Sequence, residues 1–132
     1  MQLLVILSIG ICLALALSFA SHKALLPYLS RGCQGFRWHR AFPHTDTKDI
    51  RLFLNVFGQS FGFRQRHLLK FAPADAILQI YNARNPGGGV DSLELESLAC
   101  ALTKHYNFRL QSAWHPGLTL GELFAMVRGN AP

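Results

Sequence analysis

The strongest constraint on this chain is its apolar start. None of residues 1–21 is Asp, Glu, Lys, Arg or His, and residues 3–20 are all apolar or small. As a helix rising about 1.5 Å per residue, the eighteen residues of this stretch span roughly 27 Å, close to the thickness of a bilayer core. We therefore expect residues 1–21 to form a transmembrane anchor that attaches the chain to a membrane through residues 3–20.

A cleavable signal peptide is the competing interpretation of the same stretch. Ser18-Phe19-Ala20 has the small-x-small form that signal peptidase cuts. The charges favour an anchor, because no Lys or Arg precedes the stretch, whereas four follow it between residues 23 and 40, and positive flanks stay on the cytoplasmic side. We expect a single-pass membrane protein with its C-terminal domain in the cytoplasm. Cleavage after Ala20 would instead give a secreted or periplasmic protein.

Residues 22–46 show neither the period of a strand nor that of a helix, and we interpret them as a basic juxtamembrane linker. Arg37, Trp38 and Arg40 could rest on anionic lipid headgroups, or they could simply form a solvated positive flank. The segment contains no nucleic-acid-binding motif, so we expect no nucleic-acid partner.

The remaining residues, 47–132, have the patterns of a small all-α domain. Asp46 or Thr47 can cap a helix. The apolar residues behind this cap recur at helical spacing: Ile50, Phe53, Leu54, Phe57 and Phe61. A second apolar piece covers residues 68–81, and Pro73 suits the first turn of a helix there.

Two further helices are predicted after the break at residues 85–89. Asp91 can cap the first of them. Its apolar stripe would consist of Leu95, Leu98, Leu102 and Tyr106. Residues 119–122, Thr-Leu-Gly-Glu, have the form of a capping box and open the last helix. The apolar residues of that helix are Leu120, Leu123, Phe124 and Val127.

The order of these pieces resembles the acyl carrier protein family. The resemblance covers roughly residues 47–129 and rests mainly on residues 89–98, Gly-Val-Asp-Ser-Leu-Glu-Leu-Glu-Ser-Leu. Residues 119–123, Thr-Leu-Gly-Glu-Leu, support it. It implies a four-helix, acyl-carrier-like bundle, here preceded by a transmembrane helix. It also implies that Ser92 is the attachment point of a 4'-phosphopantetheine arm.

The resemblance assigns roles to the neighbours of Ser92. Asp91 would cap the helix and help a phosphopantetheinyl transferase align the serine hydroxyl. Leu93 would contact partner enzymes, and Glu94 and Glu96 would provide the acidic edge that basic partner surfaces recognise. The partners would be acyl ligases, synthases or acyltransferases, and the carrier itself would catalyse no reaction. A phosphodiester on Ser92 would also be stabilised by the helix dipole.

Several features depart from the family pattern or leave alternatives open. Free-standing carriers are acidic, whereas this chain has a net charge of +6. Asp-Ser alone is also a common helix start, so a membrane-anchored interaction module with a carrier-like fold and no prosthetic group is the second hypothesis. The six histidines and three cysteines lack the spacing of a metal site, so we expect no bound metal.

Overall fold

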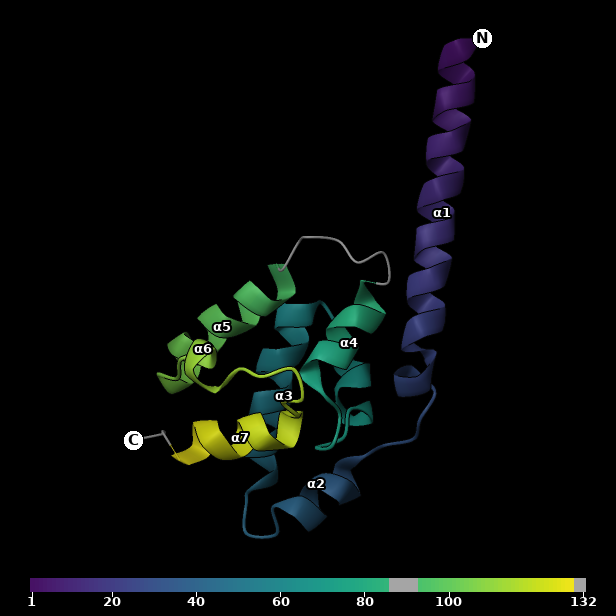
Figure 1. Ribbon diagram of the computed structural model, residues 1–132. Coiled ribbons are helices and arrows are strands. Elements are labelled where there is room, and N and C mark those ends of the chain that lie inside the picture. Colours follow the sequence, from purple (N-terminus) through teal and green to yellow (C-terminus); the bar gives the residue numbers. More distant parts are fainter. Residues whose placement is uncertain (86–92, 130–132) are drawn as a thin grey trace.

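The computed structural model describes the backbone of residues 1–85 and 93–129, and the side chains in these ranges except those of residues 17–22. Apart from one isolated bridge, the regular elements of this part are all helical, which confirms the all-α prediction (Figure 1). They are α1 (Gln2–Leu29), α2 (Gly35–Ala41), α3 (Thr47–Phe61), the 3-10 helix η1 (Gln65–Lys70), α4 (Ile77–Arg84), α5 (Leu93–Tyr106), α6 (Leu110–Ala113) and α7 (Leu120–Gly129).

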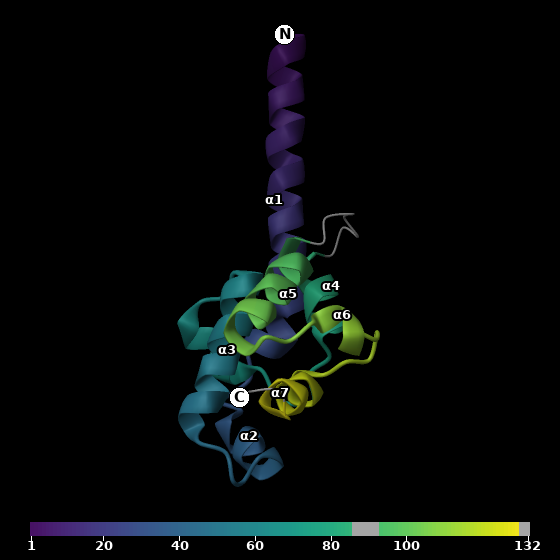
Figure 2. The same cartoon turned by 90° about the vertical axis from the view of Figure 1, so that its left-hand side faces the viewer.

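Helix α1 projects from the body as a long arm. Figures 1 and 2 both show its N-terminal part extending beyond the other elements, while its C-terminal part lies beside α4. The large apolar side chains between residues 3 and 15 are 55–76% exposed. Among the residues described, no helix contains an apolar stretch long enough to cross a membrane. The transmembrane helix predicted from the sequence is therefore not found there.

Helix α3 runs through the middle of the body and matches its prediction closely. The Asp46 side chain caps it by accepting a hydrogen bond from the Lys48 N–H at 3.0 Å. The helix ends at Gly62, whose φ of +73° is a left-handed conformation that glycine adopts without strain. The five apolar residues predicted to share one face of this helix are all buried.

The second apolar piece folds differently from its prediction. Residues 65–70 form η1, and a turn then leads into α4 at Ile77. Pro73 lies in that turn and not in the first turn of a helix. Its carbonyl oxygen accepts a hydrogen bond from the Gly121 N–H at 2.8 Å. A Cβ atom at Gly121 would lie 3.0 Å from this oxygen, so glycine permits the close approach.

The start of α7 is tied to the same turn. The Leu120 N–H donates to the Asp75 carbonyl at 3.0 Å, and the Ile77 N–H donates to the Leu118 carbonyl at 2.9 Å. The predicted capping box is present, because Thr119 and Glu122 each bond the other's backbone N–H with their side chains. All four apolar residues predicted for this helix are buried. The turn at residues 72–76 thus sets the position of α7.

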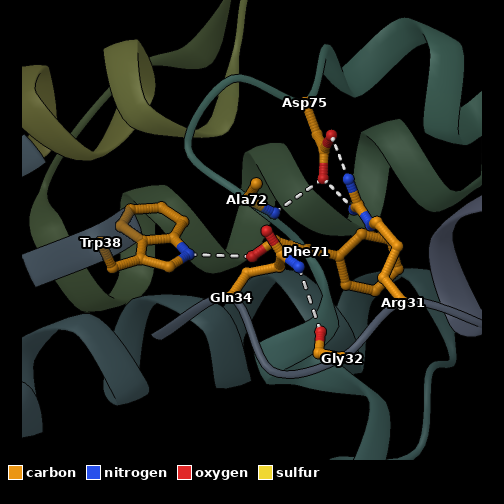
Figure 3. A network of polar contacts seen from close by, with 7 residues as sticks. All are labelled: Arg31, Gly32, Gln34, Trp38, Phe71, Ala72 and Asp75. Carbon is orange, nitrogen blue, oxygen red and sulfur yellow. Dashed lines mark hydrogen bonds and ion pairs between the residues drawn. The ribbon is translucent and has the colours of Figure 1, made fainter. Parts of the chain in front are cut away.

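The segment predicted to be a linker packs against the body. Residues 35–41 form α2, and the Trp38 side chain is 0% exposed within the aromatic core. Its indole N–H donates to the Phe71 carbonyl at 2.9 Å (Figure 3). A buried Trp38 neither rests on lipid headgroups nor belongs to a solvated flank, which were the two interpretations of this part of the segment. The domain boundary at residue 47 stays a prediction, although the core includes a residue from before it.

An ion pair between Arg31 and Asp75 fixes the end of α1 to the turn. The guanidinium donates two hydrogen bonds to the carboxylate, at 3.2 and 2.5 Å, and the same carboxylate accepts the Ala72 N–H at 2.7 Å (Figure 3). The two charged side chains are only 27% and 12% exposed. Two-point pairing of this kind holds both partners in one orientation. Arg31 also lies over the Tyr28 ring, 5.3 Å from its centre.

This geometry predicts a measurable coupling between Arg31 and Asp75. We expect Arg31→Met and Asp75→Asn each to lower the free energy of unfolding by about 1–3 kcal/mol, because each leaves a partly buried charge without its partner. The double variant should lose less than the sum of the two, with a coupling of about 1 kcal/mol. Urea unfolding of the full chain measures all three variants.

A control comes from His115, whose ring Nε2 lies 3.6 Å from the Glu122 carboxylate, with both side chains 54% exposed. His115→Ala should change the free energy of unfolding by no more than about 0.5 kcal/mol. Strictly additive losses at Arg31 and Asp75 would contradict the proposed coupling.

Candidate functional site

The candidate site lies at the start of α5, where the sequence places Ser92. Ser92 and Asp91 are outside the described residues, so their predicted roles are not tested by the geometry. The described part of the site begins at Leu93, the first residue of α5. Figures 1 and 2 show that α5 begins on the side of the body from which the arm of α1 projects.

The core holds α5 through two leucines. Leu98 and Leu102 are 0% exposed, and α5 packs against α3, α6 and α7. Leu95 and Tyr106, the other members of the predicted stripe, are half-buried at the edge of the core. The stripe is therefore confirmed at its centre, and its two ends lie at the surface. This leaves the first turn of α5 accessible while its middle is fixed.

The first turn of α5 combines an exposed apolar side chain with acidic ones. Leu93 is 60% exposed, although a leucine is usually buried. Glu94 is half-buried and Glu96 is exposed. Acidic residues in the first turn stabilise a helix through its dipole, so they also have a structural reason to be there. Exposed leucine beside carboxylates is the kind of surface that a basic protein partner can contact.

A cavity of about 360 Å³ lies beside this turn, between α5 and α6. Its walls come from Leu95, Glu96 and Ala99 of α5, and from Leu110, Gln111 and Trp114 at α6. Small-molecule sites usually have volumes of about 300–1,000 Å³ and mostly apolar walls. The cavity is therefore large enough for a small apolar group, and it has polar side chains from both helices at its lining.

A tight turn between α5 and α6 sets the far side of the cavity. Asn107 follows α5 with a φ of +51°, a left-handed conformation that Asn tolerates better than most residues. The Thr103 hydroxyl donates to the Phe108 carbonyl at 3.2 Å, and the Phe108 N–H donates to the Leu102 carbonyl at 3.3 Å. Burial raises the pKa of Tyr106 at this end of α5, and the Asp49 carboxylate raises it further.

Sequence reasoning did not find the residues that α6 contributes to the cavity. Helix α6 has only four residues, which is too short for a periodic pattern to be recognised. The described residues contain no cluster of His, Cys, Asp and Glu that could hold a metal ion. The thiols of Cys12, Cys33 and Cys100 are exposed and unbridged.

Comparison with known proteins assigns the chain to no family. No family model matches the chain, and no curated protein and no solved structure matches it either.

Two leucines of α5 provide a matched test of this arrangement. We expect Leu98→Ala to lower the free energy of unfolding by about 2–5 kcal/mol, because it leaves a cavity in the core. Leu93→Ala should change it by no more than about 0.5 kcal/mol, since its side chain is largely in solvent. Urea unfolding at constant m-value measures both. A large loss at Leu93 would mean that its side chain supports the fold and is not available to a partner.

Proposed function

We propose that this chain is an acyl carrier, which holds an acyl or similar group as a thioester on a 4'-phosphopantetheine arm attached to Ser92. The observation that carries the proposal is the first turn of α5, where Ser92 directly precedes an exposed Leu93 on a helix fixed by Leu98 and Leu102. A carrier needs such an attachment point, because the modifying enzyme and the later partners must all reach it.

The described surroundings fit the prosthetic group. The end of α5 next to Ser92 is open to solvent at Leu93, which leaves room for a phosphodiester. The dipole of this fourteen-residue helix favours a negative charge at that end. The bound group would supply a terminal thiol that carries the cargo as a thioester. The cavity between α5 and α6 would receive the apolar part of the cargo.

The acidic first turn of α5 supports docking of basic partner enzymes. Glu94 and Glu96 belong to the same first turn of α5 as the exposed Leu93. Charged groups around an apolar contact mainly increase the rate and the specificity of association. We infer that a phosphopantetheinyl transferase, and afterwards acyl ligases, synthases or acyltransferases, contact this turn. The carrier would itself catalyse no reaction.

We further propose that the exposed apolar part of α1 associates with a membrane. The large side chains between residues 3 and 15 are apolar around the whole helix, so no polar face is left for water. Helix α5 starts on the same side of the body (Figure 1). Membrane association would hold the carrier close to membrane-bound partners and raise their effective concentration.

Loading of Ser92 can be tested by intact mass. We expect the full chain, co-expressed with a broad-specificity phosphopantetheinyl transferase, to gain the mass of one phosphopantetheine group. Ser92→Ala should abolish the gain, because no hydroxyl is left to modify. Ser97→Ala is the matched control, since Ser97 lies on the same helix and is half-buried, and it should be loaded like the wild type.

The same intact-mass measurement distinguishes the carrier from the other hypotheses. An unmodified wild-type protein would favour the second hypothesis, an interaction module with a carrier-like fold and no prosthetic group. An arm that survives Ser92→Ala would contradict the assignment of the residue. The same spectrum shows whether residues 1–20 are retained, as an anchor requires, or have been removed by signal peptidase.

A further inference from the structure

A second surface of the body is chemically opposite to the start of α5. A groove of about 440 Å³ lies between α3 and η1, and we refer to it as the basic groove. Its polar lining comes from Lys48, Arg51, Asn55 and Gln65, and Leu52 and Leu68 contribute to its apolar lining. The carrier function proposed above makes no use of it.

Helix geometry explains why these side chains gather on one face of α3. Lys48, Arg51, Leu52 and Asn55 are spaced at i, i+3, i+4 and i+7, so they form one stripe along the helix. The core-facing residues of α3 occupy a different face. Leu52 is 47% exposed, although a leucine is usually buried.

The charge around the groove is positive. Residues 64–70 contain Arg64, Arg66 and Lys70 and no acidic residue. Burial lowers the pKa of His67, and Arg66, Lys70 and Arg64 lower it further, as a positive surrounding does. Two acidic residues lie at the start of α3: the Asp46 carboxylate accepts the Lys48 N–H, and the Asp49 carboxylate raises the pKa of Tyr106. Neither is among the residues that line the groove with Lys48 and Arg51.

We propose that the basic groove binds an acidic, leucine-bearing helical segment of a partner protein. Such a segment would place an apolar side chain against the exposed Leu52, above the largely buried Leu68, and carboxylates beside Lys48 and Arg51. A helix laid in a groove is a common way to recognise a peptide, with anchors at i, i+3 or i+4 and i+7. The proposal does not depend on loading of Ser92.

Two other occupants fit the groove less well. A second copy of this chain would present its own acidic first turn of α5 to the groove, but it would also bring another net charge of +6, and like charge of that size opposes self-association. An anionic membrane would meet the basic rim, but a flat lipid surface does not fill a concave groove. The position of α3 also argues against a membrane, because α3 begins near α2, at the end of the body away from the N-terminus of α1 (Figure 2).

The test uses the full chain labelled with ¹⁵N and a synthetic helical peptide with leucines at i, i+4 and i+7 flanked by glutamates. We expect saturable amide shifts concentrated in residues 48–55 and 65–69. A scrambled peptide of the same composition should bind about tenfold more weakly, because it keeps the charge and loses the apolar stripe. Lys48→Glu with Arg51→Glu should also weaken binding at least about tenfold.

The matched control is Lys23→Glu with Arg109→Glu. It changes the net charge by the same amount at two exposed residues on other elements, and it should leave the affinity within about twofold at physiological salt, where separated charges are screened. If the groove variant fails to fold, the amide shifts of the wild-type chain with the peptide and with the scrambled peptide still test the proposal.

Three results with the peptide would each overturn the proposal. These are shifts absent from the two named ranges, equal binding of the scrambled peptide, and full binding by a folded groove variant. Vesicles of equimolar phosphatidylcholine and phosphatidylglycerol, without peptide, should not shift the groove amides in preference to other basic residues. If they do, the surface binds lipid and not a protein partner. Ser92→Ala should bind the peptide normally, so failure here and failure of the carrier proposal remain distinguishable.

Discussion

The carboxylate of Asp75 is the contact on which the arrangement of the body depends. It binds Arg31 from the end of α1 and the Ala72 N–H within its own turn. The turn that it stabilises supplies the backbone oxygens to which the start of α7 bonds. The adjoining Phe71 carbonyl accepts the buried indole N–H of Trp38. The arm, α2 and α7 therefore meet at one turn, and α7 in turn packs against α5.

The sequence predicts the elements whose stability is local. The periodic apolar residues of α3 and α7, the Asp46 cap and the capping box at Thr119 and Glu122 are all confirmed, because each depends on residues within one or two helical turns. Helix α2 was not predicted, since its seven residues have no period and the buried indole N–H of Trp38 bonds a carbonyl 33 positions away. Pro73 was placed wrongly for the same reason: its carbonyl bonds a residue of α7.

The geometry of the candidate site was predictable in part, and the roles of its residues stay predictions. Local pattern identified Leu93 and the acidic turn, and the structure places them at the accessible end of a fixed helix. The cavity could not be predicted, because one of its walls comes from α6. The four residues of α6 are too few to show a periodic pattern, and their position follows from the turn at Asn107. The basic groove likewise joins two elements that only the fold brings together. With the acidic turn, it gives the chain two surfaces of opposite charge, and each would select a different class of partner.

The most direct test of the central claim is tandem mass spectrometry of the protein purified from cells that make it naturally. Trypsin should release residues 85–104, Asn to Lys, a peptide that contains Ser92 and Ser97. We predict that this peptide carries phosphopantetheine, that fragmentation ejects the pantetheine group, and that the remaining phosphate-derived mass maps to Ser92. Recovery of the peptide only in its unmodified form, from protein that is otherwise intact, would contradict the assignment of this chain as a carrier.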